Sequence, residues 1–199
     1  MNNILILYPE EFKCEAKFSR KVSNIIQRIE NITFYFPKDS NNFIFNFSKE
    51  NKLKLIEEKN WRDCRLTHAI IFDDNEVFKD ETNFIKKENI PLRLINIKIT
   101  RVVNINKDIQ YKNLKSTPSY EYIGRGSYWG NPYSIYEEGE DREEVIRKYK
   151  YDFDNDKFPN KDKSQVYKLS GKRLGCFCKP EPCHGDVLAE YLNSWDDGT

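Results

Sequence analysis

The stretch NILILY at residues 3–8 is an apolar run that stops at a proline. Short apolar runs bounded by turn residues are typical of strands buried in a sheet. ITFYF at 32–36 and HAIIFDD at 68–74 show the same pattern. Between the first two runs, residues 14–30 space their apolar side chains by three or four positions, which predicts an amphipathic helix carrying Phe18, Val22, Ile25, Ile26 and Ile29.

The alternation of strand and helix continues to about residue 99. We expect a helix at 81–89 and a fourth strand at 90–97. Residues 41–47 could form a short strand or a packed loop, and residues 48–64 are predicted to be helical. This order of elements favours an α/β fold with an open, mostly parallel sheet.

The second half of the chain has a different character. Its predicted elements are a strand at 100–106, a long polar and aromatic stretch at 107–136, a helix at 141–153, a strand at 171–178 and a helix at 184–193. We therefore predict two domains, residues 1–99 and a small α/β domain at 100–199, with no flexible linker between them. A single sheet continuing through both domains stays open as an alternative.

Composition limits the classes of function. The chain has 199 residues with 33 basic and 32 acidic side chains, so its net charge is +1 and gives no overall attraction to nucleic acid or membranes. The apolar run at the N-terminus is too short for a secretory signal or a membrane span, which predicts a cytoplasmic protein. In a reducing compartment, a cluster of cysteines indicates metal binding or chemistry more than disulfides.

Such a cluster occurs in GCFCKPEPCHGD at residues 175–186. On a strand, Cys176 and Cys178 would project from the same face. A turn with two prolines would then bring Cys183 and His184 to the start of a helix, where free backbone N–H groups favour an anion or a thiolate. Asp186 could cap that helix.

Three interpretations of this cluster remain open. It could be a zinc site with Cys176, Cys178, Cys183 and His184 as ligands, although the spacing is tight for such a site. It could be a reactive site in which Cys183, with a lowered pKa, is the nucleophile, or in which His184 and Asp186 perform acid–base catalysis. The third interpretation is that the cysteines simply pack as small apolar residues.

The segment EYIGRGSYWGNPY at 121–133 is the second unusual feature. Its glycines would let the backbone approach a ligand, its arginine could bind phosphate or carboxylate, its polar side chains could donate hydrogen bonds, and its aromatic rings could stack on a base. The spacing of the glycines does not match a dinucleotide-binding fingerprint or a P-loop. A nucleotide or single-strand contact is predicted, against the alternative of an aromatic loop that covers the core. The candidate ligand-binding residues are Gly124, Arg125, Gly126, Ser127, Trp129 and Asn131.

Together the two motifs resemble a family of unknown function found in phages, viruses and bacteria. Its members carry Gly-Arg-Gly-Ser-x-Trp-Gly-Asn-Pro followed by Gly-Cys-x-Cys-x-Pro-x-x-Cys-His-Gly-Asp, and the similarity covers residues 101–193. The resemblance implies that the residues of both motifs form one site, made of Arg125, Ser127, Trp129, Asn131, Cys176, Cys178, Cys183, His184 and Asp186.

The first half is similar to the closing part of Rossmann-like nucleotide-binding domains of the SLOG and nucleoside deoxyribosyltransferase type. The resemblance lies in HAIIFDD and in the helix and strand at 81–97, where Thr82 fits the pattern. Residues 1–99 contain no glycine, so the usual phosphate-binding loop is missing. This half is therefore expected to be a degenerate, structural copy.

These features lead to two functional hypotheses. The first is an enzyme acting on a nucleotide or a nucleic-acid end, which the segment Gly124–Asn131 binds and the cysteine–histidine–aspartate cluster transforms. The second is a binding module without turnover, for a nucleotide or a protein, whose cluster is structural or holds zinc. Zinc is the one cofactor that the sequence suggests, and no membrane partner is expected.

Overall fold

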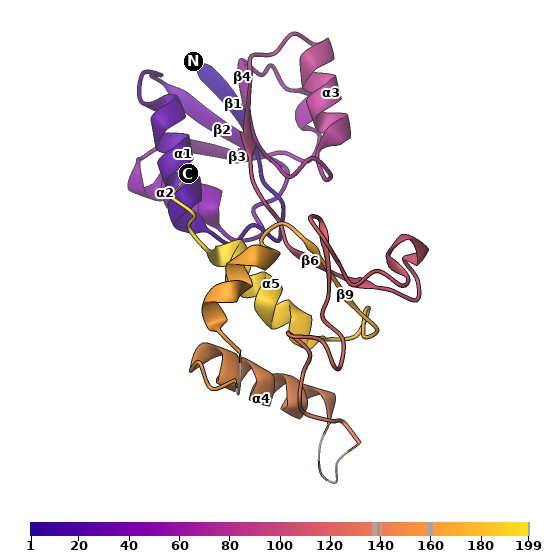
Figure 1. Ribbon diagram of the computed structural model, residues 1–199. Helices are drawn as coiled ribbons and strands as arrows, with labels where there is room; N and C mark the ends of the chain where they lie inside the picture. Colours follow the sequence, from indigo (N-terminus) through magenta and orange to yellow (C-terminus); the bar gives the residue numbers. More distant parts are fainter. Residues whose placement is uncertain (137–138, 140, 159–160, 199) are drawn as a thin grey trace. The chain divides into compact units, whose positions relative to one another are not determined.

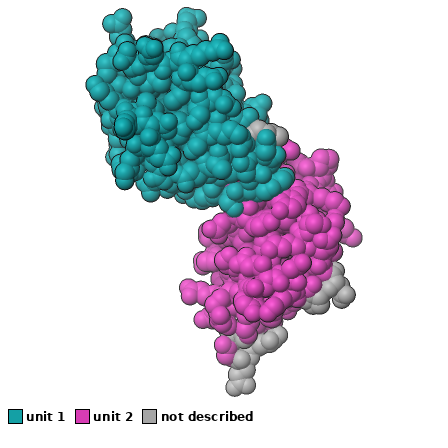
Figure 2. All heavy atoms as spheres, turned by 90° about the vertical axis from the view of Figure 1, so that its left-hand side faces the viewer, with its two compact units in different colours: residues 1–97, 194–199 teal, residues 98–193 magenta. Residues whose placement is uncertain are grey.

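The computed structural model describes residues 1–136, 139, 141–158 and 161–198 (Figure 1). The chain divides into two compact units, Met1–Ile97 with Ser194–Thr199, and Lys98–Asn193 (Figure 2). The described strands form two separate sheets, so the alternative of one continuous sheet is wrong. Within the described part of the chain, every helix is too short or too polar to span a bilayer.

The first unit contains a five-stranded parallel sheet in the order β3-β2-β1-β4-β5, which confirms the predicted α/β fold. Its strands are β1 (Asn2–Leu7), β2 (Ile32–Phe36), β3 (Lys54–Glu57), β4 (His68–Asp73) and β5 (Leu92–Asn96). Its helices are α1 (Glu15–Ile26), α2 (Phe43–Glu50), the short 3-10 helix η1 (Trp61–Asp63) and α3 (Lys79–Lys87). Helices α1 and α2 cover one face of the sheet and α3 the other (Figure 1).

The apolar runs form strands because both faces of the sheet are covered. Leu5 and Leu7 point from β1 toward the layer that contains Ile85 of α3. On the other face, Phe18 of α1 stacks on Phe72 of β4 with a centroid separation of 5.0 Å. Continuous apolar runs are what a parallel sheet with two buried faces requires.

The predictions for residues 41–64 were wrong except at residues 48–50, which are helical as predicted. Residues 43–50 form helix α2, which buries Phe43, Ile44 and Phe47 and leaves Phe45 exposed. Residues 54–57, predicted to be helical, form the edge strand β3, which pairs with β2. Its two charged side chains, Lys54 and Glu57, are exposed, as is common on edge strands.

The second unit contains a smaller mixed sheet in the order β6-β9-β8-β7. The central strand β9 is parallel to β6 and β8, and β7 is antiparallel to β8. The strands are β6 (Arg101–Asn104), β7 (Ser116–Thr117), β8 (Tyr120–Tyr122) and β9 (Arg173–Cys176). The helices are η2 (Ile109–Tyr111), α4 (Arg142–Asp154), η3 (Lys163–Leu169) and α5 (His184–Ser194).

Helix α4 packs beside the start of α5 and so brings two distant segments together. The helix is capped by Asp141, whose side chain accepts a hydrogen bond of 2.8 Å from the backbone N–H of Glu144. Its buried Tyr149 lies edge-on to the ring of His184, with centroids 5.0 Å apart. The hydroxyl of Tyr149 donates to the carbonyl oxygen of Trp129 at 2.9 Å, which fixes the glycine-containing loop to the same core.

Candidate functional site

The loop at residues 124–131 consists of two consecutive turns. The N–H of Ser127 donates to the carbonyl oxygen of Gly124, and the N–H of Gly130 donates to that of Ser127, both at 3.1 Å. Gly126 has φ of +83°, a conformation that favours glycine. A Cβ on Gly130 would lie 2.6 Å from the carbonyl oxygen of Gly124. Gly130 therefore permits the loop to fold closely on its own backbone, rather than on a ligand as the sequence suggested.

Replacing Gly130 by alanine should open this loop, since the clash is with backbone atoms that cannot rotate away. We expect a loss of about 1–3 kcal/mol in the free energy of unfolding, the usual effect of overpacking, measured by urea denaturation. Gly126→Ala is the matched control, because a Cβ there meets no atom within 4 Å and only the backbone conformation is strained. Equal stability of Gly130→Ala and the wild type would contradict this account of the loop.

Two residues predicted to contact the ligand, Trp129 and Asn131, have structural roles. Trp129 is 4% exposed and belongs to the hydrophobic core of the second unit, so it is not placed to stack on a base. The side chain of Asn131 holds the loop: its amide donates to the carbonyl oxygen of Val145 at 3.1 Å, and its oxygen accepts from the N–H of Tyr133 at 3.0 Å. Asn131 thereby ties the loop to α4 while it still faces the cavity described next.

A cavity of about 400 Å³ lies between this loop, the start of α4 and the cysteine cluster. Arg125 and Arg142 line it, and Tyr133, Tyr136 and Phe177 add aromatic surface. Tyr136 and Phe177 are well exposed, so their rings are accessible from solvent. No acidic side chain lines the cavity among the residues that the structure describes. The arrangement favours an anionic ligand with a flat, apolar part.

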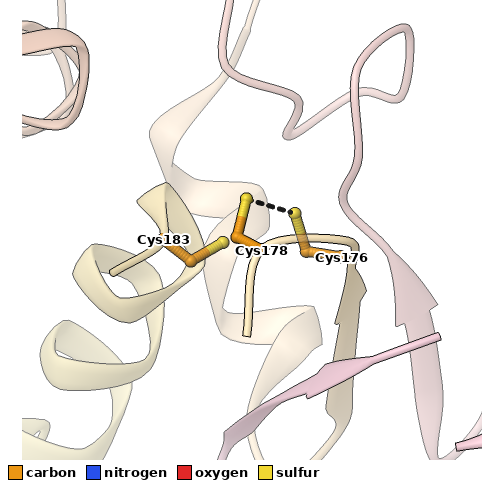
Figure 3. Close-up of side chains that lie close together, drawn as sticks. All are labelled: Cys176, Cys178 and Cys183. Atoms are coloured by element: carbon orange, nitrogen blue, oxygen red, sulfur yellow. Dashed lines mark hydrogen bonds between the residues drawn. The ribbon is translucent and has the colours of Figure 1, made fainter. Parts of the chain in front are cut away.

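The cysteine cluster, drawn in Figure 3, consists of Cys176, Cys178 and Cys183, and all three line the cavity. Strand β9 ends at Cys176, so Cys178 lies in the loop beyond the strand and not on its face. The loop nevertheless returns the Cys178 sulfur to 3.4 Å from that of Cys176. Cys183 directly precedes α5, and its sulfur accepts a hydrogen bond of 3.4 Å from the N–H of Gly185. All three cysteines are free thiols.

The pKa values of the three thiols are shifted in opposite directions by their contact. Hydrogen bonds from Cys176 and then Cys183 lower the pKa of Cys178, with a smaller contribution from the Arg142 guanidinium. The pKa of Cys183 is raised, first by its hydrogen bonds to Cys176 and Cys178 and then by burial. The contact with two neighbouring sulfurs thus acts on the pKa of Cys183 in the opposite direction to the N–H groups of the helix start, on which the predicted lowering depended.

His184 lies against the Cys183 sulfur, but among the described residues no hydrogen bond links Asp186 to the imidazole. The Nε2 of the buried His184 donates to the carbonyl oxygen of Ile123 at 2.8 Å, and its Nδ1 lies 3.7 Å from the Cys183 sulfur. Burial lowers the pKa of His184, which keeps the ring neutral and leaves Nδ1 without a proton. Asp186 instead accepts from the N–H of Cys183 at 2.9 Å and pairs with Lys179 at 2.7 Å. Its carboxylate thus caps α5, as predicted, and does not contact the imidazole.

The cavity brings together most of the site predicted from sequence, namely Gly124, Arg125, Asn131, Cys176, Cys178, Cys183 and His184. Gly126, Ser127, Trp129 and Asp186 are not among its lining residues. Sequence analysis missed Arg142 and Tyr136. The signal for Arg142 was a basic residue in the first turn of a helix, where the helix dipole disfavours positive charge.

Comparison with known proteins identifies the family of the first half. Residues 1–103, more than half of the chain, match the family model described as Minimal SLOG domain. The chain belongs to the minimal SLOG domain family. The predicted resemblance to SLOG domains is thereby confirmed, and the parallel sheet of the first unit carries it.

The second half of this minimal SLOG protein matches a different family. Residues 105–194 match the model described as Domain of unknown function (DUF4326), which confirms the resemblance stated from the two motifs. The chain is also 42% identical over 72 residues to an "Uncharacterized 12.4 kDa protein in nrdA-td intergenic region" of Enterobacteria phage T4. That match covers 36% of this chain and 65% of the phage protein. No solved structure matches the minimal SLOG protein significantly.

Proposed function

We propose that this protein is an enzyme that acts on a nucleotide or on the phosphate-bearing end of a nucleic acid. The observation that carries the proposal is the single cavity that joins the glycine-containing loop to the cysteine–histidine wall. SLOG domains are associated with nucleotide-related binding, but that match covers residues 1–103 and the cavity lies in the second unit, so the ligand class is argued from the cavity itself. The cavity volume of about 400 Å³ suits a mononucleotide.

In this proposal, Arg125 and Arg142 bind the phosphate group. A guanidinium donates two parallel N–H groups to phosphate oxygens, and such charge-assisted hydrogen bonds are stronger than neutral ones. Arg125 is exposed and makes one long hydrogen bond, 3.4 Å to the carbonyl oxygen of Tyr133, so it can reorient toward a ligand at low cost. Arg142 similarly makes a 3.3 Å hydrogen bond to the carbonyl oxygen of Pro182.

The aromatic side chains of the cavity hold the base. Tyr133 has a fixed orientation, because its hydroxyl donates to the carboxylate of Asp152, and this hydrogen bond raises the pKa of Tyr133 to about 12. Tyr136 and Phe177 supply further ring faces at the cavity mouth. Stacking on such rings tolerates any base, so the phosphate rather than the base is expected to dominate recognition.

The sulfurs and His184 form the wall at which the ligand is transformed. Cys176 and Cys183 are buried, and Cys178 is partly exposed toward the cavity. This wall is the part of the cavity with nucleophilic and metal-ligating groups, so chemistry is assigned to it.

A non-catalytic binding module is the second candidate. It is favoured by the position of Asp186, whose carboxylate is engaged by the helix cap and by Lys179, so that among the described residues no carboxylate forms a hydrogen bond with His184. Under this alternative the same cavity binds a nucleotide and releases it unchanged.

The test uses the full chain and calorimetry with AMP, adenosine, and oligonucleotides with and without a 5′ phosphate. We expect AMP and the phosphorylated oligonucleotide to bind at least about tenfold more tightly than their unphosphorylated counterparts, since one charged hydrogen bond contributes about 1.5–3 kcal/mol. Equal affinity for AMP and adenosine, or binding of neither ligand class, would overturn the proposal. Chromatography of the bound ligand after incubation then separates the candidates, because the enzyme converts it and the binding module returns it intact.

A further inference from the structure

The three sulfurs of the cysteine wall form a compact group. The Sγ atoms of Cys176, Cys178 and Cys183 all lie within 4.8 Å of one another, although the residues come from the end of β9, the following loop and the residue before α5. The three sulfurs lie close together, with the Cys183 side chain directed toward Cys178 and Cys176 (Figure 3). Cys176 and Cys183 belong to the hydrophobic core of the second unit and Cys178 packs against it, but their sulfurs also lie close to one another, which packing as small apolar groups does not require.

The spacing of the sulfurs suits a tetrahedral metal. Zinc–sulfur bonds of about 2.3 Å place neighbouring sulfurs of a tetrahedral site about 3.8 Å apart. The sulfurs of Cys176 and Cys178 are 3.4 Å apart, which is close to that value and far longer than a disulfide bond. Thiolate sulfur is also the ligand type that selects zinc over magnesium or calcium.

We propose that Cys176, Cys178 and Cys183 bind one zinc ion whose fourth coordination position faces the cavity. All three cysteines line that cavity, so a ligand in it can reach the metal. His184 does not belong to this group of three cysteines, whose sulfurs all lie within 4.8 Å of one another. Its ring is held by the hydrogen bond from Nε2 to the carbonyl oxygen of Ile123. A zinc site with three protein ligands and one free position is typical of catalytic rather than structural zinc.

The backbone around the sulfurs is already fixed. The side-chain amide of Asn104 donates to the carbonyl oxygens of Phe177, at 3.1 Å, and Lys179, which holds the loop that carries Cys178. On the other side, Gly185 donates its N–H to the Cys183 sulfur. Gly185 has no room for a side chain, because a Cβ there would lie 2.4 Å from the side chain of Ile123. These supports position the ligands without requiring the metal to order a mobile loop.

The role of the zinc ion in catalysis rests on the proposed function, whereas the existence of the metal site does not. A zinc ion with a free position polarises a phosphoryl oxygen or a bound water molecule, which is chemistry that the engaged Asp186 carboxylate cannot supply. The Arg142 guanidinium lies beside Cys178 and offsets part of the negative charge of three thiolates. The metal site itself follows from the sulfurs alone, whatever ligand enters the cavity.

The first experiment is metal analysis of the full-length protein, purified without chelator. We expect stoichiometric zinc in the wild type. Cys176→Ser, Cys178→Ser and Cys183→Ser should each lose at least about nine-tenths of it, whereas Cys14→Ser and Cys64→Ser, in the first unit, should keep it. Should a serine variant fail to fold, thiol modification of the wild type followed by a colorimetric zinc assay gives the same answer. The proposal is overturned if the wild-type protein contains no zinc and also fails to bind added zinc. It is equally overturned if the variants of Cys176, Cys178 and Cys183 retain zinc.

The second experiment tests the free position in cobalt-substituted protein. We expect thiolate-to-cobalt charge-transfer absorption and tetrahedral ligand-field bands that shift when azide is added. His184→Gln keeps a side-chain amide that can donate to Ile123 and should retain the metal. If His184→Gln loses the metal, or if the cobalt absorption bands do not change on addition of azide, then the metal has four protein ligands and the proposed free coordination position is wrong. Because neither readout uses a nucleotide, failure of the zinc site and failure of nucleotide binding are distinguished.

Discussion

Replacing both Arg125 and Arg142 by alanine is expected to weaken AMP binding by at least about a hundredfold. Each guanidinium is assigned one charge-assisted interaction with the phosphate, and such an interaction contributes about 1.5–3 kcal/mol, or roughly ten- to a hundredfold in affinity. Arg142 is partly buried and should have the larger single effect, whereas Arg125 is exposed and more screened by solvent. Calorimetric titration of the two single variants and the double variant measures these contributions.

Arg147→Ala is the matched control for this experiment. Arg147 is a second arginine of α4 that pairs with Glu144 at 2.6 Å and does not line the cavity. We expect it to change the affinity for AMP by less than about twofold, the usual range for an exposed ion pair away from a site. Adenosine binding should be unchanged in all variants. A double variant that binds AMP like the wild type would show that the phosphate lies elsewhere.

Tyr149→Ala should have the largest effect on stability in the second unit. Tyr149 is fully buried, lies 4.7 Å from the ring of Phe158 and 5.0 Å from that of His184, and donates to Trp129. Removing a buried aromatic ring typically costs about 3–5 kcal/mol. The loop and His184 lose a common support, so we also expect weaker nucleotide binding. Urea denaturation followed by circular dichroism measures the first effect and calorimetry the second.

Two further variants separate the contributions of Tyr149. Tyr149→Phe removes only the hydroxyl and leaves the Trp129 carbonyl unpaired, so it should cost about 1–3 kcal/mol. Tyr151→Ala, on the exposed side of the same helix, should cost less than about 1 kcal/mol. If Tyr149→Ala and Tyr151→Ala lose the same stability, then Tyr149 does not anchor the loop and α5 as described.

The sequence determined four of the five described strands of the first unit and the identity of the two motifs. Apolar runs such as residues 3–8 can be buried only inside a sheet covered on both faces, and this requirement is local to each run. Where the pattern was weaker, prediction failed. Residues 54–57 became a strand because they pair with β2, and no property of the segment alone indicates that partner.

The composition of the candidate site was decided by tertiary structure. The sequence grouped Trp129 with the ligand contacts, but the packing of α4 draws it into the core, and the same packing brings Arg142 to the cavity. It placed Cys176 and Cys178 on one strand face, whereas a loop beyond the strand returns the second sulfur to the first. Residue types and short spacings fix which chemistry a motif can perform. Which side chains face the same cavity depends on contacts between segments far apart in the chain, and these exist only once the chain has folded.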